Sequence, residues 1–353
     1  MDLMEEGNVS CGVKNCATPG FQENCPNQHC PEGVSMSECF LFVILVSLML
    51  FGLLGNTLTL LVVWLRPHMR SSTDLYLSSM AVSDLLNLLL LPLDIYKLMI
   101  GLGVFACKLT SFLSECCYYC TILHITFLSL ERYLAVCWPI TSKTLVTHRR
   151  TRAVIGCLWL GAAVSAAPLL VMIEVEHERK EDEIGICILS EYSHSSGLML
   201  VAFIIYNLYF LVPLCILGLV FILIGRTLRL RPQSSLKDKS HQHTVKMLGV
   251  IFLAFVLCWL PYIVCQTMLY VAFTAGLDSA HNILTNTFMF CFVIAWALSR
   301  LSSGINPLVY YMMSARYRQA VRSLVRLQCL TPSHGLSTTL SSGHSTTTLL
   351  TDS

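Results

Sequence analysis

Apolar residues dominate this chain in long runs, which shorter polar and charged segments separate. A helix of about 20 apolar residues crosses the roughly 30 Å hydrocarbon core of a bilayer, and seven runs reach that length. They cover approximately residues 39–65, 73–99, 104–137, 150–173, 196–228, 243–271 and 281–311. Because unpaired backbone groups are costly in lipid, each run is expected to form a helix. The pattern predicts an all-α membrane protein built as a seven-transmembrane helix bundle.

Composition and charge agree with this class and predict its orientation. Hydrophobic residues make up 55% of the 353 residues and charged residues only 12%, against about 25% in a soluble domain. Basic residues gather after the first, third, fifth and seventh runs, and the opposite segments are acidic. Basic loops stay in the cytoplasm, which predicts a multi-pass plasma-membrane protein with its N-terminus outside and its C-terminus inside. The net charge of +2 does not favour a nucleic-acid partner.

The two ends of the chain flank the predicted seven-helix domain at residues 39–313. Residues 1–38 lack the apolar core of a cleavable signal peptide. Five cysteines there suit extracellular disulfide loops, whose pairing stays open, and Asn8 begins a glycosylation sequon. Residues 314–329 have an amphipathic pattern, which predicts a short eighth helix on the inner leaflet. Cys329 then follows as a palmitoylation site or as a free thiol.

Charged residues inside the apolar runs are the first functional candidates. Placing an unpaired charge inside the membrane costs roughly several kcal/mol of free energy, so a charged residue there indicates a functional site by default. Five charged residues stand at such positions: Asp84, Asp94, Glu115, Arg132 and Arg300.

Short motifs recur in order along the seven runs. The third run ends in Glu131-Arg132-Tyr133, the sixth carries Cys258-Trp259-Leu260-Pro261, and the seventh carries Asn306-Pro307-Leu308-Val309-Tyr310. Asn56, Asp84 and Trp159 mark the first, second and fourth runs. Each motif is weak alone, but together they make the chain resemble the rhodopsin-like (class A) G-protein-coupled receptors.

A narrower resemblance rests on further segments. Leu91-Pro92-Leu93-Asp94, Ser114-Glu115-Cys116 and Thr244-Val245-Lys246-Met247-Leu248 resemble the ghrelin and motilin receptor subfamily. The resemblance implies a peptide-hormone ligand outside the cell and a heterotrimeric G protein inside, of the Gq type that acts through phospholipase C and calcium.

The same resemblance implies roles for residues in the inner half of the bundle. Arg132, with Glu131 and Tyr133, would face the G protein; an arginine that only extends to the interface is the alternative. Trp259 above Phe255 would be the activation switch, with Pro213 and Ile122 packed beneath it. On the seventh run the switch would include Asn306, Pro307 and Tyr310.

Two more features follow from the resemblance, and a third follows from the composition of the tail. Asp84, Thr121, Ser302 and Asn306 would hold an allosteric sodium ion, although a protonated, hydrogen-bonded Asp84 is the alternative; no other cofactor is expected. Cys107 and Cys187 would form a disulfide. Residues 330–353 are expected to be disordered, and their many hydroxyl groups suggest phosphorylation by receptor kinases and binding of arrestin. A tail that only solvates the chain is the alternative.

The outer half of the bundle is expected to bind the ligand. The expected ligand-binding residues are Asp94, Glu115, Tyr118, Tyr262, Gln266 and Arg300. Two carboxylates in an outward-opening bundle favour a cationic group such as a peptide amino terminus. Members of the subfamily pair the acid that matches Glu115 with an arginine on the sixth helix. In this chain Gln266 stands at the position of that arginine, so Glu115 is expected to lack this partner. Arg300 replaces an aromatic residue, and we expect it to pair with Asp94, one helix away.

Other function classes remain as alternatives with less support. A membrane transporter usually shows internal repeats and broken helices, and none is evident in the sequence. A retinal pigment needs a lysine on the seventh run, which has none. No metal cluster or nucleophile–base pair suggests an enzyme. Another class A receptor, for a different peptide or a charged lipid, stays open.

Overall fold

A computed structural model of the chain describes residues 36–65, 71–176, 185–230, 236–274, 282–313 and 317–323. Asn8, the five N-terminal cysteines, Cys329 and the Ser/Thr-rich tail therefore lie outside the described residues. The chain divides into two units, residues 1–42 and residues 43–353. The second unit holds every site discussed below.

Helices make up nearly all of the described chain. In order the elements are α1 (Met36–Leu65), α2 (Ser72–Met99), α3 (Val104–Cys137), α4 (Pro139–Leu145), α5 (His148–Ala166), α6 (Leu169–Met172), β1 (Ile173–Glu176), β2 (Ile186–Leu189), α7 (Glu191–Ser195), α8 (Leu198–Leu230), α9 (Leu236–Thr274) and α10 (Asn282–Met313). Among the described residues, six helices are long and apolar enough to cross a membrane. The seventh long helix is α10, whose 32 residues would extend about 48 Å. The seven predicted transmembrane helices are thus α1, α2, α3, α5, α8, α9 and α10.

Two helix boundaries differ from the hydropathy runs. Helix α9 begins at Leu236, seven residues before the run at 243–271, because its first turns are polar and hydropathy does not register them. The run at 150–173 is not one helix: α5 ends at Ala166 and the short α6 follows Pro168. Pro168 has no amide hydrogen to continue the helical bonds at this point, although α2, α8, α9 and α10 each continue through an internal proline.

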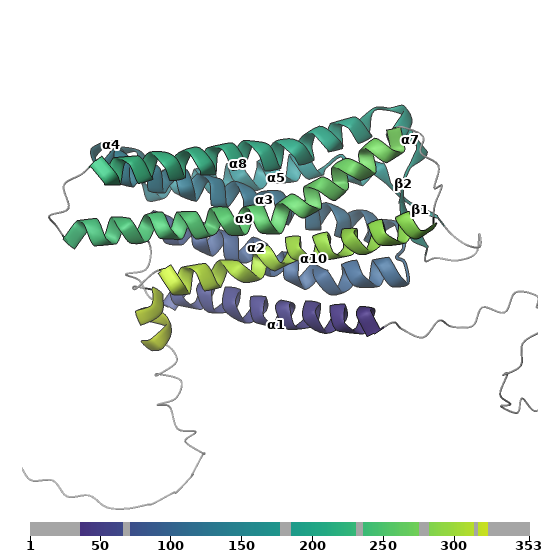
Figure 1. Cartoon of the computed structure of the whole chain (residues 1–353), viewed down its shortest axis with the longest axis horizontal. Helices are drawn as coiled ribbons and strands as arrows, with labels where there is room; N and C mark the ends of the chain where they lie inside the picture. Colours follow the sequence, from purple (N-terminus) through teal and green to yellow (C-terminus); the bar gives the residue numbers. More distant parts are fainter. Residues whose placement is uncertain are drawn as a thin grey trace, which may run out of the picture. The chain divides into compact units, whose positions relative to one another are not determined.

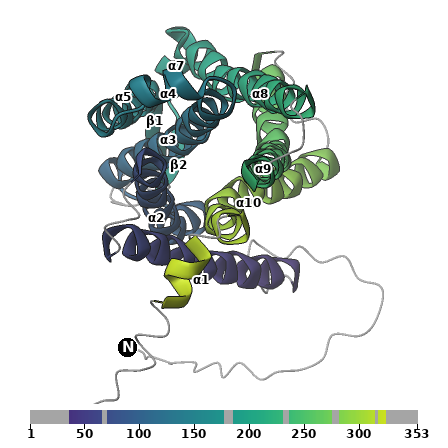
Figure 2. The same cartoon turned by 90° about the vertical axis from the view of Figure 1, so that its left-hand side faces the viewer.

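The long helices lie side by side, and α3 occupies the middle of the bundle. Figure 1 shows β1, β2 and α7 at one end, which we call the hairpin end, and α4 at the other, the α4 end. Helix α3 contacts α2, α5, α8 and α9, and α9 also contacts α10; Figure 2 looks along the helices from the α4 end. The central position of α3 explains why even its polar residues are buried, among them Thr121 and His124.

Glycines allow α1 to approach α10 closely. A Cβ atom on Gly55 would lie 2.9 Å from Cβ and 3.0 Å from Cγ of Pro307, whose ring cannot rotate away. A Cβ atom on Gly52 would lie 2.6 Å from Cδ1 of Leu88 on α2. The two glycines therefore set the spacing between α1 and its neighbours.

Replacing Gly55 with alanine should consequently destabilise the bundle. Overpacking costs about 1–3 kcal/mol, and because the Pro307 ring cannot rotate away we expect about 2 kcal/mol here, which exceeds the gain in helix propensity of about 1 kcal/mol. We expect a thermal-unfolding midpoint (Tm) about 2–4 °C lower for the purified receptor in detergent. The matched control is Gly161→Ala on α5, where nothing lies within 4 Å of the added Cβ. An unchanged Tm for Gly55→Ala would contradict the close approach to Pro307.

A short helical segment at 317–323 packs against the bundle within the range predicted for an eighth helix. Tyr317, Ala320 and Val321 are buried, and Arg322 is exposed. The Tyr317 hydroxyl lies 2.9 Å from the Thr59 hydroxyl on α1, and burial raises the pKa of Tyr317 above its usual value. The apolar side of this segment thus faces the protein. The rest of the predicted helix, 314–316 and 324–329, lies outside the described residues.

Candidate functional site

A cavity of about 340 Å³ lies between the long helices near the hairpin end. Its polar lining comes mainly from α2, α3, α8, α9 and α10: Asp94, Lys97, Ser111, Ser114, Glu115, Tyr206, Tyr262 and Arg300. Cys187 of β2 also lines it, and Cys187 is joined to Cys107 of α3 by the disulfide that the resemblance implied. We call this space the main cavity.

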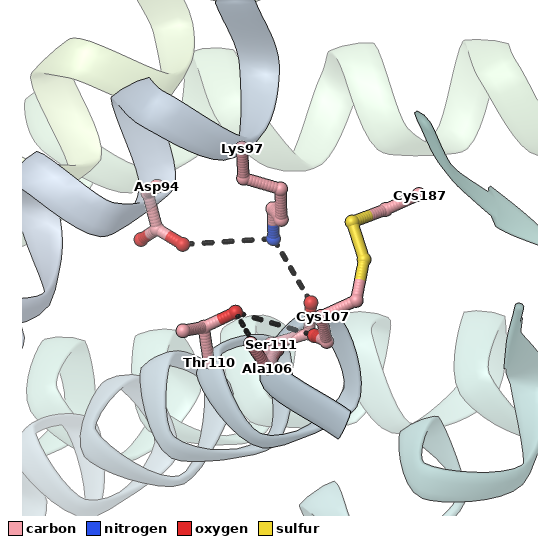
Figure 3. Close-up of a disulfide and its surroundings, with 7 residues drawn as sticks. All are labelled: Asp94, Lys97, Ala106, Cys107, Thr110, Ser111 and Cys187. Atoms are coloured by element: carbon pink, nitrogen blue, oxygen red, sulfur yellow. Dashed lines mark hydrogen bonds and ion pairs between the residues drawn. A yellow bond between two sulfur atoms is a disulfide. The ribbon is translucent and has the colours of Figure 1, made fainter. Parts of the chain in front are cut away.

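Asp94 has three donor groups around its carboxylate, and Figure 3 shows one of them, the Lys97 ammonium. One carboxylate oxygen lies 2.7 Å from the Arg300 guanidinium and 3.0 Å from the Ser114 hydroxyl. The other lies 3.5 Å from the ammonium of Lys97, which donates in turn to the Ser111 hydroxyl at 2.9 Å. Both oxygens of Asp94 are therefore engaged within the protein. Asp94 pairs with Arg300 as the sequence predicted, but it does not offer a free carboxylate to a cationic ligand.

Arg300 links α10 to α2 at two points. Its guanidinium donates to the side-chain oxygen of Asn87 as well as to Asp94, and it lies 5.3 Å from the centre of the Trp296 ring. The planar guanidinium offers several donors in a rigid fork, so one side chain can hold both partners at once. Only 13% of the Arg300 side chain is exposed, which makes this contact a structural connection as well as part of the cavity wall.

Glu115 differs from Asp94 because one of its oxygens has no partner. Tyr206 hydrogen-bonds to the Glu115 carboxylate, whereas Oε2 has no hydrogen-bond partner among the described residues. Gln266 does not reach Glu115; it donates to the Tyr262 hydroxyl at 2.8 Å. The free acceptor of the main cavity is thus Glu115, which fits the expectation that this acid lacks a partner on α9.

Aromatic rings close the inner side of the main cavity. Tyr118 meets Trp259 edge to face, with 4.0 Å between the ring centres, and Tyr262 lies 6.2 Å from Tyr118. Trp259 is 2% exposed. Beneath it Phe255 stacks on Phe210 at 5.6 Å, and Ile122 and Pro213 are buried nearby on α3 and α8. Trp259, Phe255 and Ile122 thus belong to one buried apolar cluster, and their role as a switch stays a prediction.

A second, mostly apolar cavity of about 230 Å³ adjoins the first. Tyr206 and Phe292 line both cavities, and residues of α8 and α9 such as Phe203 and Leu269 line the second alone. A ligand with a charged part and an apolar part could therefore fill both spaces, on either side of Tyr206.

Asp84 is fully buried further in and is held by three polar neighbours. The Thr121 hydroxyl donates to it at 3.1 Å and the Asn306 amide at 2.9 Å, and Ser303 is a third hydrogen-bond partner. The Ser302 hydroxyl donates to the carbonyl of Ser299 at 2.7 Å, so its oxygen can still accept, and its role at a sodium ion stays a prediction. A helix rotates about 100° per residue, so adjacent serines face different neighbours. Carboxylate and hydroxyl oxygens together suit a hard cation.

Comparison with known proteins decides which family this architecture represents. Residues 55–310 match the family described as 7 transmembrane receptor (rhodopsin family). The chain belongs to this family. Its members are receptors rather than enzymes. The receptor is 40% identical over 292 residues to the growth hormone secretagogue receptor type 1 of Sus scrofa, with 79% of each chain covered.

More distant relatives extend the comparison. The motilin receptor of Homo sapiens is 33% identical over 330 residues, covering 79% of this receptor and 78% of the relative. The neurotensin receptor type 1 of Homo sapiens is 27% identical over 329 residues, covering 84% and 77%. The resemblance to the ghrelin and motilin receptor subfamily is thereby confirmed.

At the α4 end of the receptor, Arg132 is tied to two neighbours. Its guanidinium lies 2.8 Å from the Glu131 carboxylate and donates to the Thr73 hydroxyl of α2 at 2.5 Å. Thr73 donates to Glu131 at 3.3 Å. Tyr133 packs against Val220 and Ile224 of α8 with Val136. The side chain of Tyr310 lies outside the described residues, while Pro307 is buried beside Gly55.

Sequence reasoning missed three residues that contact the charged groups of the receptor's main cavity. Lys97 stands three positions after Asp94, and this (i, i+3) spacing predicts a contact on a helix. Asn87 and Tyr206 are neutral, so they gave no comparable signal. Their importance follows from which helices pack together, because each one bonds to a charged residue of another helix.

Proposed function

We propose that this receptor binds a peptide hormone of the ghrelin or motilin type at its hairpin end and activates a heterotrimeric G protein at its α4 end. The observation that carries the proposal is the main cavity, which has a carboxylate with a free oxygen at Glu115; Glu115 also lines a smaller space together with Tyr118 and Trp259. The names of the relatives, a growth hormone secretagogue receptor and a motilin receptor, support this ligand class.

The proposed orientation has the N-terminus and the hairpin end outside the cell and the C-terminus inside. It is supported by the basic residues, which cluster in the segments at the α4 end and are retained in the cytoplasm. In this orientation a ligand reaches the main cavity from the extracellular side. The disulfide between Cys107 and Cys187 then lies in the oxidising compartment, where such bonds persist.

In the main cavity, we assign the amino terminus of the peptide to Glu115. Asp94 is engaged by Arg300 and Lys97, so its charge is compensated before any ligand arrives. Tyr118, Tyr262 and Gln266 would contact the ligand through hydroxyl, ring and amide groups. An apolar side chain or acyl chain of the ligand would enter the second cavity beyond Tyr206.

Activation in this proposal is a shift between two bundle conformations. The agonist binds the active form more tightly and raises its population. Trp259 and Phe255 would transmit ligand binding in the main cavity to the inner half of α9. That half of α9 would then move away from α3 and α8. Arg132 would then leave Glu131 and Thr73 to face the G protein, while Asn306, Pro307 and Tyr310 adjust on α10.

Further partners complete the proposal. A sodium ion at Asp84, with Thr121, Ser302 and Asn306 around it and Ser303 beside the carboxylate, would stabilise the inactive form. Coupling would be to the Gq type, with phospholipase C and calcium release. Receptor kinases would phosphorylate the Ser/Thr-rich tail, Asn8 would carry a glycan, and Cys329 would be palmitoylated next to the eighth helix.

Calcium imaging of transfected cells tests the ligand and the coupling together. The probes are ghrelin, motilin and their unacylated or truncated forms, applied to cells with receptor confirmed at the surface. We expect a dose-dependent calcium rise with at least one peptide, and loss of that rise when the peptide amino terminus is acetylated. Surface-expressed receptor that responds to none of these peptides would contradict the ligand class. A response unchanged by acetylation would contradict the role of Glu115.

A further inference from the structure

A third and much smaller cavity separates the main cavity from Trp259. Its volume is about 10 Å³, enough for about one water molecule. Glu115, Ser114 and Arg300 line both this cavity and the main cavity, whereas Tyr118 and Trp259 line only the smaller one. We call it the relay cavity because it lies between the free carboxylate and the tryptophan.

Unpartnered polar atoms concentrate around the relay cavity. In the described part of the chain, five buried side-chain nitrogen or oxygen atoms have no hydrogen-bond partner. Three of the five belong to residues that line this one cavity: Glu115 Oε2, Tyr118 Oη and Trp259 Nε1. Tyr118 is 6% exposed and Trp259 2%, so bulk water does not reach them. Buried polar groups are nearly always hydrogen-bonded in folded proteins, and three exceptions around one space indicate a binding site.

The chemistry of the three atoms restricts what the relay cavity can hold. The indole nitrogen of Trp259 only donates a hydrogen bond, an ionised Glu115 only accepts, and the Tyr118 hydroxyl does both. An ammonium group cannot accept from Trp259, and a carboxylate cannot donate to Glu115. A water molecule or a neutral hydroxyl group can do both.

We propose that the relay cavity binds one water-sized hydroxyl group, which accepts from Trp259 and donates to Glu115 while Tyr118 completes its coordination. In the resting receptor this group is a water molecule; an agonist hydroxyl that reaches inward from the main cavity can replace it. The site connects the carboxylate that faces the ligand to the tryptophan by hydrogen bonds. Its consequence for signalling rests on the proposed role of Trp259 as the switch, whereas its existence does not.

The direct test is a density map of the agonist-free, full-length receptor in lipid nanodiscs, at a resolution that shows ordered water. We expect a separate peak within hydrogen-bond distance of Glu115 Oε2, Tyr118 Oη and Trp259 Nε1. A map with water peaks elsewhere in the bundle and none here would overturn the proposal. In a map with motilin bound, density continuous with the peptide would identify a ligand hydroxyl as the occupant, and a separate peak would identify water.

The substitution Tyr118→Phe gives an independent test whose sign separates a filled site from an empty one. If a bound hydroxyl group bridges Glu115, Tyr118 and Trp259, the variant loses the hydrogen bond between that group and Tyr118. The Tm should then fall by about 2 °C or more. If nothing bridges them, the variant only removes a buried unsatisfied hydroxyl, and Tm should stay the same or rise. Tyr119→Phe is the matched control, because Tyr119 is equally buried on α3 but does not line the relay cavity.

A Tm of the Tyr118→Phe variant equal to or above that of the unmodified receptor would therefore contradict the proposal that the relay cavity is filled. Thermal unfolding is measured without ligand or G protein. Failure of this test is thus distinguishable from failure of the proposed peptide ligand.

Discussion

Replacing Arg300 with alanine is expected to lower the receptor's surface expression or to abolish its ligand response. The variant leaves the buried carboxylate of Asp94 without its closest cation and Asn87 without its donor. Removing one partner of a buried pair costs about 3–5 kcal/mol. Lys97 remains 3.5 Å from Asp94, so the lower end of that range is expected. Surface labelling by flow cytometry and calcium dose–response curves measure the two effects.

Two matched variants separate charge from geometry at this position. Arg300→Lys keeps the positive charge but cannot serve Asp94 and Asn87 in one rigid fork, so it should recover expression only in part. Lys97→Met removes the longer and more exposed contact to Asp94 and should have the smaller effect. Unchanged expression and potency in Arg300→Ala would refute the view that the Asp94 pair connects α2 and α10.

Replacing Glu115 with glutamine is expected to reduce agonist potency by about 30-fold or more while expression stays near normal. Loss of one partner from a buried charge pair costs about 2–5 kcal/mol in binding, and each 1.4 kcal/mol is about tenfold in affinity. Glutamine keeps the shape of the side chain and an oxygen that can accept from Tyr206. Calcium dose–response curves with the active peptide measure the shift.

The control for Glu115→Gln is Glu191→Gln, which removes an exposed acid from α7 at the same end of the receptor. It tests whether distant attraction of a cationic peptide, rather than direct contact, explains the effect. Equal loss of potency in both variants, or no loss in Glu115→Gln, would contradict the assignment of the peptide amino terminus to Glu115.

The two predictions reflect a division of roles between the acids of the main cavity. The cavity holds two acids and two bases, yet both bases lie against Asp94. The side formed by α2 and α10 therefore carries an excess positive charge, and Glu115 on α3 carries the uncompensated negative charge. A ligand with an ammonium next to an acceptor group would match both sides.

Much of this arrangement followed from local pattern. The apolar runs located the seven helices with ends that differ by at most seven residues, because the part of a helix that crosses the membrane must be apolar. The charged residues in those runs indicated the sites, since a charge in lipid persists only with a partner or a function. The pairing of Arg300 with Asp94 was predicted from the same argument, as a cation and an acid at similar depth on neighbouring helices.

The sequence alone therefore determined the fold class, the order of the helices and the charged residues that face the interior. Only the tertiary structure decided the partners of those residues: Ser303 as a further partner of Asp84, Lys97 as the second cation of Asp94, and the three unpartnered atoms around the relay cavity. Hydropathy depends on residue type and is readable along the chain. Hydrogen bonding depends on the rotation and depth of each helix against its neighbours. A shift of one residue along a helix changes the direction of the side chain by about 100°.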